Sequence, residues 1–144
     1  MIRAALMPTM VASAAMAFAT PASDDAVVTC RRAALELAGA WTNDGFRLRE
    51  RTWTGVLPAG KPALARVTLV GGNRYRFSAA TNAASTSLSM SIYSESGVPI
   101  DADNYLDGPL VASGFLPRVS GSYLIAISES GGTPVPFCLV YSFK

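Results

Sequence analysis

The hydrophobic pattern changes its period once along the chain, and this change separates a helical part from a strand part. Over residues 25–39, apolar residues recur three or four positions apart, as on the buried face of an α-helix. Ser23 followed by Asp24 and Asp25 is a typical helix start, because a hydroxyl caps free N–H groups and acids favour the positive end of the helix dipole. Gly39 can end the helix as a C-cap. We therefore predict one amphipathic helix over about 25–39.

After Trp41 the period becomes 2, which indicates strands. The clearest strand covers 87–93, where Leu88, Met90 and Ile92 alternate with serines and share one face. Similar short runs recur up to residue 143, separated by turns rich in Gly, Pro and Ser. The chain is therefore predicted to be mainly β, with about 7–8 strands forming an antiparallel β-sandwich over 46–143, and with one N-terminal α-helix.

Two of these strands are joined by a short glycine-rich turn. Residues 66–70 and 74–79 both read as strands, and Gly71, Gly72 and Asn73 lie between them. The pattern predicts a hairpin in which the aromatic residues of the second strand point into the core.

The first 22 residues read as a secretory signal peptide. Arg3 is followed by an apolar run from Ala4 to Phe18, and the small-x-small pattern of residues 17–19, or that of residues 20–22, offers a cleavage site. This run is shorter than the roughly 20 apolar residues that a membrane span needs. We expect residues 23–144 to form one exported domain, periplasmic or secreted, with no transmembrane segment in the mature chain.

The two cysteines, Cys30 and Cys138, lie near the two ends of the predicted domain. An even number of cysteines in an exported protein favours a disulfide, which would hold the N-terminal segment against the C-terminal strand. Closing so long a loop is worth on the order of 4–5 kcal/mol in the chain-entropy model. A rival interpretation, a lipid anchor on Cys30, rests on the faint lipoprotein-like signal at 27–30.

Charge and composition exclude several functions. The chain has 12 Lys and Arg residues against 10 Asp and Glu, which is too balanced for a nucleic-acid-binding face. It has no histidine, which removes the common general base, the usual zinc ligand and a Ser-His-Asp triad. We expect no enzymatic activity, and a small carboxylate-dependent hydrolase is a distant alternative.

Three groups of side chains are candidate binding sites. Asp101, Asp103, Asn104 and Asp107 gather oxygen ligands within a predicted polar loop over 101–109, which favours ordinary turn chemistry and has a Ca²⁺ site as its alternative. Two sets of arginines on extended segments could form an anion-binding strip, or a plain solvent face; they are Arg47, Arg49, Arg51, Arg74 and Arg76. Three aromatic residues are candidate sugar-stacking platforms: Trp41, Trp53 and Tyr105.

The order of the strand motifs resembles the bacterial pre-peptidase C-terminal domain family, which is a jelly-roll-like β-sandwich. The matching motifs are a strand, a glycine-rich turn and an aromatic strand (69–77), an alternating strand that ends in a glycine turn (88–97), and a Gly-x-Tyr strand (121–127). A closing strand follows them. The similarity covers about residues 55–143.

The resemblance implies an extracytoplasmic accessory or binding module, and in some members calcium binding. The family's alternating strand often carries outward aspartates, whereas this chain has Ser87, Ser89 and Ser91 there, and hydroxyls are weaker Ca²⁺ ligands. We therefore expect an exported, non-catalytic module that binds a protein or a cell-envelope polymer. The alternative is a structural envelope component that assembles with itself or scaffolds other exported proteins through an edge strand.

Overall fold

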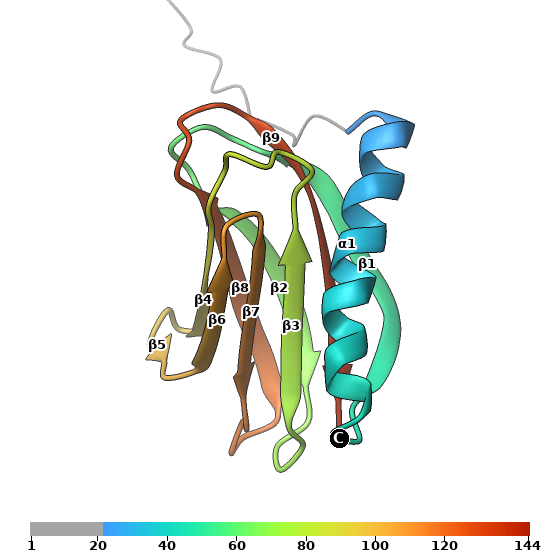
Figure 1. Cartoon of the computed structure of the whole chain (residues 1–144). Helices are drawn as coiled ribbons and strands as arrows, with labels where there is room; N and C mark the ends of the chain where they lie inside the picture. The colour runs from blue at the N-terminus through green and yellow to red at the C-terminus, as the bar shows by residue number, and fades with distance from the viewer. Residues whose placement is uncertain (1–21) are drawn as a thin grey trace, which may run out of the picture.

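The computed structural model describes residues 22–144, which fold into one helix and nine strands (Figure 1). The helix is α1, Asp24–Thr42. The strands are β1 Arg47–Leu57, β2 Ala63–Leu69, β3 Tyr75–Ala80, β4 Leu88–Ser94, β5 Pro99–Ile100, β6 Asp103–Asp107, β7 Leu110–Phe115, β8 Gly121–Glu129 and β9 Val135–Phe143. The predicted signal peptide lies outside the described residues, except for Ala22.

The strands form two antiparallel sheets that pack face to face, so the predicted β-sandwich with an N-terminal helix is confirmed. The five-stranded sheet has the order β1-β9-β3-β7-β6, and the four-stranded sheet has the order β2-β8-β4-β5. Two short strands that the sequence pattern did not predict, β5 and β6, bring the number to nine.

The core lies between the sheets and consists of the inward-facing residues of alternating strands. In β2, for example, Ala65, Val67 and Leu69 are buried while their neighbours are exposed. Aromatic rings fill the five-stranded side: the Phe77 and Tyr141 rings are stacked with their centroids 5.4 Å apart. The alternation read from the sequence therefore does correspond to one buried and one exposed face.

The outer face of the five-stranded sheet is covered by α1, which runs alongside β3 and β9 (Figure 1). The residues that the helix buries fully in this contact are small, namely Cys30, Ala34 and Ala38, which pack on Ala80, Cys138 and Val140, and the partly buried Leu35 packs beside them. Small side chains allow the helix to approach the sheet closely, but they bury little apolar area. The outer face of the four-stranded sheet carries no helix among the residues described.

The helix start was predicted correctly and its end was not. The backbone N–H of Ala26 donates to Ser23 Oγ at 3.4 Å, as a capping serine should. The helix continues through Gly39, however, and ends at Thr42 with Asn43 as its C-cap. The left-handed conformation that favours glycine is taken by Gly45, at φ 88°, in the turn that leads into β1.

The predicted hairpin over 66–79 is wrong. Strand β2 pairs only with β8, and β3 pairs with β7 and β9, so the turn between β2 and β3 crosses from one sheet to the other. The turn glycines bond to the β7–β8 loop, which makes the same crossing: Gly72 N–H donates to Pro117 O at 2.8 Å, and Gly71 N–H to Ser120 Oγ at 2.7 Å. Glycine-rich turn chemistry fits such an arch as well as a hairpin.

Candidate functional site

An apolar groove opens between β1 and β2, which are edge strands of different sheets. Its cavity volume is about 360 Å³, within the range of small-ligand pockets. Its walls come from both sheets and from the β1–β2 loop; they are Trp53, Thr54, Val56, Pro58, Pro62, Ala63, Leu64, Ala65, Ile127 and Phe137. None of these side chains is ionisable and Thr54 is the one polar member, so the groove suits an apolar ligand and offers no titratable acid or base.

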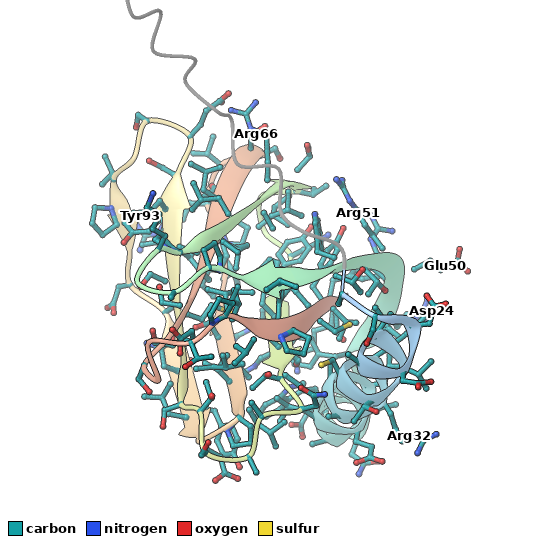
Figure 2. All side chains as sticks on the ribbon, turned by 90° about the horizontal axis from the view of Figure 1, so that it is seen from above. Asp24, Arg32, Glu50, Arg51, Arg66 and Tyr93 are labelled. Atoms are coloured by element: carbon teal, nitrogen blue, oxygen red, sulfur yellow. The ribbon has the colours of Figure 1, made fainter. Side chains whose placement is uncertain are left out.

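Trp53 is the largest side chain in the groove, and its ring is held on two sides. Its centroid is 5.7 Å from that of Tyr141 in the core, and the guanidinium carbon of Arg51 lies 4.6 Å from the Trp53 ring centroid. Both contacts restrict the indole, so one wall of the groove is preformed. Figure 2 shows Arg51 beside Glu50 at the bend of β1, on the rim of the molecule.

The three aromatic residues predicted as stacking platforms lie in three separate places. Trp41 is at the end of α1, Trp53 is on β1, and Tyr105 is on β6 at the opposite edge of the same sheet. Tyr105 is 42 % exposed, and its hydroxyl donates to Asp107 Oδ2 at 3.3 Å. The negative charge of Asp107 raises the pKa of Tyr105. The three aromatic residues therefore do not form one sugar-binding surface.

The predicted acidic loop is wrong in its conformation, because Asp103–Asp107 forms strand β6 on the edge of the five-stranded sheet. In a strand, Asp103 and Asp107 point to one face and Asn104 to the other. Asn104 Oδ1 accepts a hydrogen bond from Ser113 Oγ on β7. Asp101 precedes the strand. Within residues 22–144, no group of three or more His, Cys, Asp or Glu side chains gathers to hold a metal ion.

The five arginines of the predicted anion-binding strip fall into two regions. On β1, the Arg49 guanidinium carbon lies 4.8 Å from the Phe143 ring centroid, and Arg51 covers Trp53 as described. Arg76 on β3 lies on the helix side, with its guanidinium carbon 4.5 Å from the Trp41 ring centroid. The other two arginines of the predicted strip, Arg47 and Arg74, are exposed. Aromatic rings thus take up three of the five guanidinium groups.

Cys30 and Cys138 lie in the same buried cluster, so the predicted contact between the N-terminal segment and the last strand is present. Both are free thiols in the structure, and the predicted disulfide between them is not formed there. Burial raises the pKa of Cys138 to about 11, with a smaller contribution from the neighbouring Cys30. Burial also raises the pKa of Cys30, partly offset by a hydrogen bond from the Asn82 backbone.

The groove was not predicted from the sequence. One signal was available: Leu64 is a large apolar residue at an outward position of β2, and it is 63 % exposed. The prolines on either side of the β1–β2 loop, Pro58 and Pro62, also mark a rigid connection. What could not be read from the sequence is that β1 and β2 belong to different sheets whose edges face the same opening.

Comparison with protein-family models and with curated proteins finds no match to this chain. Among the residues that the structure describes, no helix has both the length and the apolar character that crossing a membrane requires.

Proposed function

We propose that this protein is an exported, non-catalytic binding module that holds an apolar segment of its ligand in the β1–β2 groove. The observation that carries the proposal is the lining of the groove, which is preformed, apolar and open to solvent between two edge strands. Such cavities are the usual places where a small fold binds another molecule. The ligand class is a protein or a cell-envelope polymer with an exposed apolar stretch.

The absence of ionisable groups from the groove lining supports binding rather than catalysis. Acid–base and nucleophilic catalysis both need titratable side chains within hydrogen-bond reach of the substrate. The sequence adds that no histidine is present to serve as a base. The groove lining also offers no carboxylate for the small hydrolase considered above.

Export rests on the signal-peptide pattern of residues 1–22. The resemblance to the pre-peptidase C-terminal domain family supports an accessory role outside the cytoplasm, and the β-sandwich fold is compatible with it. The second candidate, a structural envelope component, is favoured by the free strand edges, which can pair with other chains.

In an oxidising compartment we propose that Cys30 and Cys138 become joined. The two thiols would lose two protons and two electrons to a disulfide oxidant, which would be reduced to its dithiol. The shared cluster of the two cysteines supports this step, since the helix and the strand that carry them already pack together.

The groove is tested with an uncharged fluorescent apolar probe, N-phenyl-1-naphthylamine, and with the emission of Trp53. A Trp41→Phe background leaves Trp53 as the only tryptophan, because the chain has two. We expect Leu64→Asp to weaken probe binding about tenfold, since it places a charge in the apolar wall. Leu106→Asp is the matched control, because Leu106 is 64 % exposed on the edge strand β6, away from the groove. Equal effects of both variants would refute the groove as the site.

A further inference from the structure

We propose that the groove is occupied by an extended peptide segment that adds a strand to the free edge of β2 and places an acidic side chain opposite Arg66. This inference rests on the proposed function and names its ligand more closely. Strand addition to an exposed sheet edge is a general mode of peptide binding: backbone hydrogen bonds give affinity and alternate side chains give specificity.

The four sheet edges differ in how well they are protected against strand addition. On β1 the register shifts between Leu48 and Thr52, which breaks the edge, and arginines flank the shift. Strand β6 is short and has an aspartate at each end, and β5 has two residues. By contrast, β2 pairs with β8 without a shift from Ala63 to Leu69. Of the two edge strands longer than five residues, β1 and β2, it is the one whose ladder has no register shift.

The groove lies along the first part of this edge, with Ala63, Leu64 and Ala65 in its lining. A strand added to β2 lies about 4.8 Å from it, and its side chains alternate between the two faces of the sheet. Side chains that point inward would therefore enter the groove opposite Trp53 of β1. Apolar residues at alternate positions of the peptide fit this wall.

The charge on the outer face of the four-stranded sheet favours a peptide with an acidic residue. Arg66 is at the middle of β2, and its neighbours across the sheet are Leu124 and Tyr93. The other outward residues of β2, β8 and β4 are uncharged: Leu64, Thr68, Ser122, Ala126, Ser128, Ser89 and Ser91. Figure 2 shows Arg66 and Tyr93 on the side of the molecule away from α1. An acidic residue in the added strand would complement this single positive charge.

The same arginine argues against a second copy of the chain as the occupant. If two β2 edges paired antiparallel about their centres, Arg66 of one copy would face Arg66 of the other. Like charges directly opposite on neighbouring strands are destabilising. A different chain with a carboxylate at that position is therefore favoured over self-association through β2.

The test uses a labelled peptide of alternating valine and threonine with a central glutamate, and follows its fluorescence anisotropy on titration with the full-length protein. One comparison peptide has lysine at the centre, and another keeps all side chains but carries an N-methyl group on every backbone amide. We expect the lysine peptide to bind about tenfold more weakly than the glutamate peptide. The N-methyl peptide should lose binding, because it cannot donate the strand hydrogen bonds.

Charge reversal in the protein completes the test. Arg66→Glu should reverse the preference between the glutamate and lysine peptides, whereas Arg32→Glu, an exposed arginine on α1, should leave it unchanged (Figure 2). Retained binding of the N-methyl peptide, or an unchanged preference in Arg66→Glu, would overturn strand addition at β2. A dimer in sedimentation that Arg66→Thr strengthens, because this substitution removes the two like charges, would also overturn it, in favour of a second copy.

The two proposals fail in different ways. If the apolar probe binds and Leu64→Asp weakens it, but no peptide binds, the groove stands and the peptide inference is wrong. If neither the probe nor any peptide binds, both are wrong.

Discussion

Cys30 on α1 and Cys138 on β9 are completely buried in one small cluster, 108 positions apart in the sequence (138 − 30). The rest of that cluster is Ala34, Ala38, Ala80 and Val140. Its side chains are small, so the hydrophobic contribution to docking the helix is limited. A covalent link at this point would therefore join a helix and a strand whose buried contact is small.

We expect the oxidised protein to be markedly more stable than the reduced one. A bond that closes a loop of about 100 residues is worth about 4–5 kcal/mol in the chain-entropy model. Intact-mass analysis after alkylation without reductant shows whether the bond is present in protein folded in an oxidising compartment, and chemical denaturation with and without reductant gives the difference in unfolding free energy. Two alkylated thiols in protein from that compartment would contradict the disulfide.

The reduced protein should lose stability at alkaline pH. Burial raises the pKa of Cys138 from an ordinary value of 9.0 to about 11, so the folded state holds the thiol proton more tightly than the unfolded chain. Such a group adds stability below about pH 9, and that stability is lost as the pH rises through about 11. Unfolding free energies of the reduced protein between these limits test the effect. Cys138→Ala and the oxidised protein are the controls, and a slope equal to theirs would contradict it.

Calcium should leave the melting temperature of the protein unchanged. The strand geometry of β6 directs Asp103 and Asp107 away from Asn104, so these oxygens cannot surround one ion together. Thermal melts with millimolar Ca²⁺ and with EDTA measure this directly. A rise in melting temperature that Asp103→Asn abolishes would restore the calcium interpretation of the acidic segment.

The sequence predicted local structure better than pairing. Alternation along 87–93 and helical spacing over 25–39 correspond to β4 and to most of α1, because burial of one face imposes its period on the residues. Pairing partners are set by contacts between distant segments. The turn at Gly71 and Gly72 was therefore mistaken for a hairpin, although it bonds to a loop more than 40 residues further along.

The candidate sites show the same division. The candidate site residues were chosen because they lie close together in the sequence, but the fold does not bring all of them together in space. Asp103 and Asn104 are neighbours in the chain and lie on opposite faces of β6. Conversely, Val56 and Leu64 both line the groove because the edges of two sheets lie side by side there. The amino-acid composition of these segments does not indicate that the two edges are neighbours. Arg66 stands out only once its neighbours across the sheet are known.

Two glycines with equally close neighbours should respond differently to replacement by alanine. A Cβ at Gly71 would be 2.8 Å from the carbonyl oxygen of Arg118, so the β2–β3 turn and the β7–β8 loop would have to separate. We expect Gly71→Ala to lower the unfolding free energy by about 1–3 kcal/mol, as overpacking typically does. At Gly114 the close atom is Cδ of Arg76, at 2.7 Å, in a flexible side chain that can move away. We expect a cost below about 1 kcal/mol there.

The Gly114→Ala variant should instead change the environment of Trp41. The guanidinium carbon of Arg76 lies 4.5 Å from the Trp41 ring centroid, and a displaced Arg76 would no longer cover that ring. A change in Trp41 fluorescence in a Trp53→Phe background measures this displacement. In an Arg76→Ala background the obstructing side chain is gone, so adding the Gly114→Ala substitution should have no cost and no further effect on Trp41. If Gly114→Ala instead destabilises the protein as much as Gly71→Ala, and does so with Arg76 removed, then the backbone rather than the arginine limits the space at Gly114.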